Sequence, residues 1–208
     1  MKRAMMVIFL LLGMIVNVFA QKASKFEVYT DAGISFPIGP EDFSKYWKMG
    51  FNFGGGVGYR YPLNSDVTLI TDFGFNRFSL DRDKMLQDMG WVDPGTSISG
   101  GDIAIITFSE NLKAILPTSS TKVTPYLCGG TGLFIFSVNN MGSNNGEIEG
   151  KGYSEYLFSI LLGGGTDIAI GERTDLFIEG KYVGFTGYEN KQIFPIKIGI
   201  KYKIKFNN

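Results

Sequence analysis

The chain has no histidine and only one cysteine among its 208 residues. The absence of histidine excludes a Ser-His-Asp triad, a Cys-His couple and any zinc site that contains histidine. A single cysteine can form neither an internal disulfide bond nor a thiolate metal site. The sequence therefore predicts no catalytic residue, no metal site and no cofactor, and we expect that the protein is not an enzyme.

Charge is scarce and balanced. The 20 Lys and Arg residues match 20 Asp and Glu residues, so the formal net charge is zero. A nucleic-acid binder would carry a basic excess to neutralise phosphates, which excludes nucleic acid as a general partner. Charged residues make up 19% of the chain, below the ~25% typical of soluble domains, and aromatic residues reach 14%. The composition is therefore more apolar than that of an ordinary soluble domain.

The first twenty residues have the pattern of a secretory signal peptide. Lys2 and Arg3 form a basic start, an apolar run follows over residues 4–16, and Ala20 offers a small side chain to a signal peptidase. The alternative is an uncleaved anchor, because the run is only slightly shorter than the ~17–25 residues of a spanning helix. We favour cleavage and export. The predicted division of the chain is a signal peptide, 1–20, and a barrel domain, 21–208.

The last segment, residues 194–206, alternates with a period of two. One parity is apolar: Phe194, Ile196, Ile198, Ile200, Tyr202, Ile204 and Phe206. The other parity carries Lys197, Gly199, Lys201, Lys203 and Lys205. Successive side chains of a strand point to opposite faces, so this pattern predicts a strand with one wholly apolar face. A segment of 13 residues at ~3.3 Å per residue, tilted by ~45°, spans about 30 Å, the thickness of a bilayer core.

Seven further segments predict strands: 25–37, 50–62, 66–80, 101–116, 122–138, 153–170 and 175–187. Their connections alternate in length, and the long ones cover residues 38–49, 81–100 and 139–152. Up-and-down membrane barrels have short periplasmic turns and longer external loops. The sequence therefore predicts an all-β fold, an eight-stranded antiparallel up-and-down transmembrane barrel.

The polar faces of these strands would line the lumen. Eight strands enclose a space that side chains just fill, so we expect a plugged interior and no wide pore. The residues predicted to form a charge network there are Glu27, Asp31, Arg60, Asp72, Glu179, Lys181, Lys197, Lys201, Lys203 and Lys205.

Two positions do not follow the pattern. Glu110 shares its parity with Phe108 and Leu112, which would aim a carboxylate at lipid. A β-bulge over 109–111 is one way to turn it inward, and the placement of Glu110 stays open. In segment 122–138 both parities are apolar, so the register of this fifth strand and the facing of Cys128 stay open.

Three short stretches resemble a known family. Asn111-Leu112-Lys113, residues 122–127 (KVTPYL) and residues 129–133 (GGTGL) are similar to a signature of the small outer-membrane β-barrel proteins (porin-like or opacity-protein-like) of Gram-negative bacteria. The resemblance implies the barrel fold and the bacterial outer membrane, with membrane lipid, lipopolysaccharide and the barrel-assembly machinery as partners. It implies no particular activity, because the family shares none.

Several functions fit such a chain. We favour a structural or surface-interaction role, with a narrow channel or a binding protein for a small solute as the alternative. A secreted soluble carrier of the lipocalin type is a further alternative, with apolar side chains inside and lysines in water. Residues 40–48 and 83–89 predict short helices in the external loops. Trp47 and Trp91 in these loops would either contact a partner or lipopolysaccharide, or pack on the barrel mouth as interfacial anchors.

Overall fold

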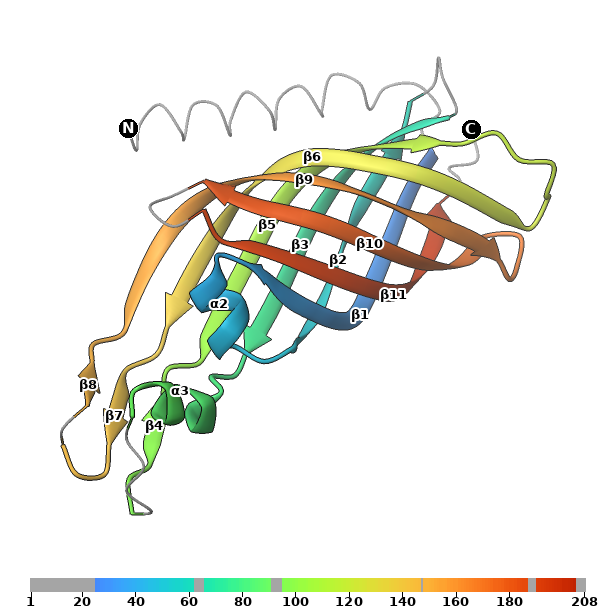
Figure 1. Cartoon of the computed structure of the whole chain (residues 1–208). Helices are drawn as coiled ribbons and strands as arrows, with labels where there is room; N and C mark the ends of the chain where they lie inside the picture. Colours follow the sequence, from blue (N-terminus) through green and yellow to red (C-terminus); the bar gives the residue numbers. More distant parts are fainter. Residues whose placement is uncertain (1–24, 62–65, 91–94, 147, 187–189, 205–208) are drawn as a thin grey trace, which may run out of the picture.

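A computed structural model describes residues 25–61, 66–90, 95–146, 148–186 and 190–204. Within these residues, eight antiparallel strands form a closed barrel in the order β1-β11-β10-β9-β6-β5-β3-β2 (Figure 1). Their bounds are β1 Lys25–Gly39, β2 Gly50–Arg60, β3 Val67–Phe78, β5 Ile103–Ile115, β6 Val123–Val138, β9 Tyr153–Ala169, β10 Thr174–Thr186 and β11 Gln192–Ile204. The predicted strand number and antiparallel arrangement are confirmed. The predicted signal peptide lies outside the described residues.

The remaining elements gather at one end of the barrel, called here the loop end (Figure 1). They are α2 (Glu41–Tyr46), α3 (Arg82–Asp88) and a small sheet of β4 (Ile98–Gly100), β7 (Met141–Ser143) and β8 (Glu149–Gly150). The opposite end, called the turn end, carries the connections β2–β3, β5–β6 and β9–β10. Among the described residues, no helix combines the length and apolarity needed to cross a membrane.

Both predicted short helices are present, α2 within residues 40–48 and α3 one residue earlier than 83–89. Helix α2 follows Pro40, with Glu41 and Asp42 in its first turn and Lys45 in its last, which suits the helix dipole. Helix α3 is capped by Asp81, whose carboxylate accepts a hydrogen bond from the Lys84 amide at 3.4 Å. The small sheet was not predicted, because strands of two or three residues carry no readable alternation.

The barrel is apolar outside and polar within. In β11, Ile198 and Ile200 are 59% and 50% exposed, whereas the neighbouring Lys201 is 4% exposed. Large apolar side chains are exposed on the other strands as well, among them Phe73 on β3 and Leu162 on β9. This polarity is the inverse of a soluble lipocalin-type barrel, so that alternative is wrong.

The interior has two parts. Toward the turn end it is charged, and toward the loop end it is packed with apolar side chains. This apolar cluster consists of Phe43, Phe78, Ile103, Ile105, Phe134, Phe136, Leu157, Leu161, Val183, Phe185 and Ile193. Phe43 belongs to α2, so this helix reaches into the barrel mouth.

The apolar half of the lumen explains the two-sided apolar pattern of the fifth barrel strand, β6. Tyr126, Cys128 and Phe136 face inward and are buried, whereas Leu127 faces outward and is exposed. The Cys128 thiol lies 3.7 Å from Glu179 Oε2. Strand β6 therefore carries apolar side chains on both its lumen face and its outer face.

The structure settles the placement of Glu110, and there is no bulge over 109–111. The pairing of β5 runs without interruption through Glu110, which lies opposite Thr71 on β3 and Thr131 on β6. Glu110 stays on the outer face, and the Thr71 hydroxyl contacts both of its carboxylate oxygens, at 2.9 and 3.0 Å. A hydrogen-bond donor on the neighbouring strand thus makes a bulge unnecessary.

The tight packing of the lumen generates a stability prediction. A Cβ atom at Gly165 on β9 would lie 2.3 Å from the Ile178 carbonyl oxygen of β10 and 2.7 Å from the Tyr126 hydroxyl, so Gly165→Ala forces the backbone or the ring to move. We expect the free energy of unfolding to fall by about 1–3 kcal/mol, measured by urea unfolding of the barrel in lipid vesicles. Gly171→Ala in the β9–β10 turn is the control, because its nearest neighbour is the Thr174 Cβ at 3.9 Å. Equal stability of the two variants would contradict the packing.

Candidate functional site

The turn-end half of the lumen holds a balanced set of ion pairs. Six carboxylates and six cations of the described residues take part: Glu27, Asp31, Asp72, Asp167, Asp175 and Glu179 with Arg60, Lys113, Lys181, Lys197, Lys201 and Lys203. We call these twelve residues the lumen network. Buried charges are tolerated when they are paired, and here the two signs balance.

One group of the lumen network centres on Asp167 of β9. Its Oδ2 atom accepts from Lys113 Nζ at 2.5 Å and from Lys201 Nζ at 2.8 Å. Lys201 also lies 3.5 Å from Glu27 Oε1. The Lys113 ammonium sits 3.7 Å from the centroid of the Tyr126 ring, a cation–π contact. Side chains from several strands therefore converge on one point inside the barrel.

A second group centres on Lys181 of β10. Its Nζ atom lies 2.9 Å from Glu179 on the same strand and 3.1 Å from Asp72 on β3, across the lumen. Asn111 donates to Asp72 at 2.8 Å, and the Tyr126 hydroxyl donates to Glu179 at 3.2 Å. This group joins strands that are not neighbours in the barrel.

The two groups leave little space. The cavity between them measures about 20 Å³, enough for a single water molecule at most. The interior at this level is packed side chain to side chain. The ion-paired side chains therefore fill this cross-section of the lumen.

The structure places most of the predicted lumen residues in this network. Lys203 pairs with Asp175 at 2.7 Å near the turn end, and Arg60 lies 4.0 Å from Glu27. Lys205 and Trp91 lie outside the described residues. Sequence reasoning missed Lys113, Asp167 and Asp175. Their strand parity could have found Lys113 and Asp175, since Lys113 opposes Leu112 and Asp175 shares the parity of Glu179.

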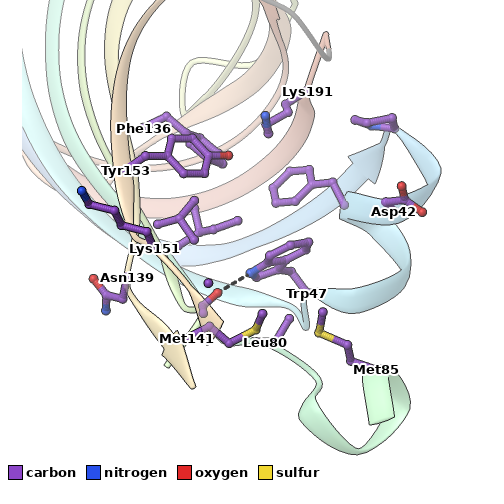
Figure 2. A pocket seen from close by; sticks show the side chains of 16 residues that line it. Asp42, Trp47, Leu80, Met85, Phe136, Asn139, Met141, Lys151, Tyr153 and Lys191 are labelled. Carbon is purple, nitrogen blue, oxygen red and sulfur yellow. Dashed lines mark hydrogen bonds between the residues drawn. The ribbon is translucent and has the colours of Figure 1, made fainter. Parts of the chain in front are cut away.

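A second candidate site is a pocket of about 510 Å³ at the loop end. Figure 2 shows Trp47 in its middle, Phe136 and Lys191 on one side, and Leu80, Met85 and Met141 on the other. The Trp47 indole donates to the Gly101 carbonyl at 3.0 Å, which fixes the ring in the pocket wall. Trp47 therefore packs inside the barrel mouth.

Aromatic rings form the wall of this pocket toward the lumen. The Phe43 ring of α2 lies 5.7 Å from Phe78 and 6.3 Å from Phe136, both in edge-on contact. Beside them, the buried Lys191 ammonium lies 4.8 Å from the Phe136 ring centroid and 3.5 Å from Glu155 Oε1. The pocket thus combines apolar walls with a buried cation.

Two ion pairs hold α3 against α2 beside the pocket. Lys45 contacts Asp88 at 2.6 Å, and Lys48 contacts Asp81 at 3.4 Å. The hydrogen bond from Lys45 lowers the pKa of Asp88 below its ordinary value, and the same bond raises the pKa of Lys45. Both groups are exposed, so the pair acts as a weak link between the helices.

Comparison with known proteins supports the barrel at the level of the fold. Neither a family model nor a curated protein sequence matches the chain. Among solved structures, Neisserial surface protein A has a TM-score of 0.57 at 18% identity, over 86% of this chain and 97% of that one. A major outer membrane protein from Thermus thermophilus has a TM-score of 0.58 at 12% identity, over 88% of this chain and 100% of that one. The chain therefore has the fold of the small outer-membrane β-barrels.

The lumen network predicts a large cost for removing its central cation. Lys181→Met leaves Asp72 and Glu179 buried without their shared partner, so we expect the free energy of unfolding to fall by about 3–5 kcal/mol. Urea unfolding in lipid vesicles measures this free energy of unfolding. The exposed ion pair of Lys48 with Asp81 provides the control, because Lys48→Met should lower the free energy of unfolding by only about 0–1 kcal/mol. A Lys181 variant as stable as the control would show that the network does not hold the barrel together.

The ion pair between Lys45 and Asp88 predicts that the contact between α2 and α3 depends on pH. Because the pKa of Asp88 is lowered, the contact is fully formed above 3.8, the ordinary value, and is lost as the pH falls through the lower value of the folded protein. A carboxyl titration followed by NMR should give a midpoint for Asp88 below 3.8. Lys45→Met should raise the midpoint toward the ordinary value, because the hydrogen bond from Lys45 is the largest cause of the low pKa, whereas Lys48→Met should leave it low. An unchanged midpoint in the Lys45 variant would contradict the pairing.

Proposed function

We propose that the protein is an outer-membrane β-barrel with a structural or surface-interaction role and no catalytic activity. The observation that carries the proposal is the polarity of the barrel, apolar outside and ion-paired inside. A lipid-facing apolar band with a polar interior is the arrangement of transmembrane barrels. The absence of histidine supports a role without catalysis.

The proposed orientation puts the loop end outside the cell and the turn end in the periplasm. Long external loops and short periplasmic turns are the rule in such barrels, and the connections of this chain follow it. Export through a signal peptide over residues 1–20 and insertion by the barrel-assembly machinery belong to the same proposal. Membrane lipid would then contact the barrel wall, and lipopolysaccharide would surround the loop end.

Free passage of solutes is not part of this role. The paired charges at the turn end fill the lumen, and the aromatic rings of Phe43, Phe78 and Phe136 close it again at the loop end. In a surface role, the residues that contact a partner would lie in the loops, because binding residues are common on loops that a rigid scaffold positions.

Fractionation and conductance together test the proposal. The protein should collect with the outer envelope and migrate differently on gels before and after boiling. In planar bilayers, protein with this heat-shifted migration should give no stable single-channel steps. Recovery in the soluble periplasmic fraction would overturn the membrane placement. Stable steps from folded protein would overturn the closed lumen and favour the narrow channel instead.

A further inference from the structure

We infer that the loop-end pocket binds a small amphipathic anion, a single apolar chain that ends in a carboxylate. The inference adds a ligand class to the proposed surface-interaction role and rests on that role for its biological meaning. Binding itself is a property of the folded barrel and does not depend on where the cell places it.

The size and walls of the pocket support an apolar ligand body. A volume of about 510 Å³ lies within the ~300–1,000 Å³ of small-molecule sites. The wall includes Leu80, Met85 and Met141, together with the ring of Trp47. Methionine side chains adapt to irregular apolar shapes, and an aromatic ring offers a flat contact face. An extended alkyl chain fits such a surface.

Two lysines, Lys151 and Lys191, line the pocket against one carboxylate, Asp42, and this positive excess supports an anionic head group. Lys191 lies opposite the two methionines in Figure 2, with its ammonium against the Phe136 ring. The residue is only 8% exposed, so its charge acts in a poorly hydrated place where electrostatic attraction is strong. Lys191 is already paired with Glu155 at 3.5 Å, so an incoming carboxylate would share the ammonium with that side chain.

The two ends of the pocket therefore define one orientation. The carboxylate would lie at Lys191 and Phe136, and the chain would extend past Trp47 toward Met85 and Met141 (Figure 2). The aromatic rings that line the inner wall would stop the ligand from entering the lumen network. The site takes up a ligand without transporting it.

Quenching of Trp47 fluorescence by 11-bromoundecanoate tests the inference. The purified full-length barrel, with Trp91→Phe so that Trp47 alone reports, is placed in lipid nanodiscs and titrated with the brominated carboxylate. We expect saturable quenching. Shortening the chain by one methylene should weaken binding about fourfold, as the burial of a CH₂ group predicts. The uncharged 11-bromoundecanol should bind at least tenfold more weakly.

Matched variants separate specific binding from partitioning into lipid. Lys191→Met removes the cation and keeps the chain, and we expect it to weaken carboxylate binding at least tenfold while leaving alcohol binding unchanged. Lys122→Met, at the exposed turn end, is the control and should bind normally. Met85→Glu brings a second carboxylate to the pocket and should also weaken binding. All variants must keep the heat-shifted gel migration, which reports folding.

Three results would overturn the inference: no saturable quenching of Trp47, equal quenching in the Lys191 and Lys122 variants, or equal affinity for the carboxylate and the alcohol. A barrel that binds the carboxylate but fractionates as a soluble protein would overturn the proposed function and leave the inference standing. A barrel that is found in the outer envelope but does not bind the carboxylate would overturn the inference and leave the proposed function standing.

Discussion

Mutual neutralisation of buried charges is the constraint on which this barrel depends. An exterior that presents isoleucine and phenylalanine side chains is unfavourable for lysine, so the lysines of the lumen network point inward, although Glu110 stays on the outer face beside Thr71. Inside, an unpaired ammonium or carboxylate would lose its hydration without compensation. The six carboxylates and six cations of the lumen network remove that difficulty by pairing across strands, and the pairing in turn closes the passage through the barrel.

Much of this architecture is readable from the sequence because strands repeat with a period of two. The alternation in β11 predicts its faces residue by residue, and most of the predicted network is found where parity places it. Parity does not say which charges meet. Lys181 pairs with Asp72, 109 positions earlier in the chain, because barrel closure brings β10 and β3 face to face across the lumen. Asp167 was missed because it follows a run of glycines in which alternation is hard to read.

The errors have physical causes as well. The sequence of β6 does not show which of its faces points inward, because the inner face passes from the charged half of the lumen to the apolar half and carries apolar side chains there. The sequence left the placement of Glu110 open, because a carboxylate on the outer wall conflicts with the apolar pattern and a bulge was one way to avoid it. The regular ladder of β5 is retained instead, and Thr71 supplies the hydrogen bond. In the small sheet at the loop end, β4 pairs with β7, a segment far away in sequence, and local patterns do not reveal such pairing.

The contact between Lys201 and Glu27 joins the last barrel strand to the first. Neutrality along this seam is complete only when the two terminal strands meet. In a sheet that has not yet closed, these two charges would lie apart in apolar surroundings, without water to solvate them. The free energy of such a sheet would stay high until the first and last strands pair. The pair of Lys201 and Glu27 therefore favours the closed barrel, whereas a pair between strands that follow one another in the chain, such as Lys203 with Asp175, can form before closure.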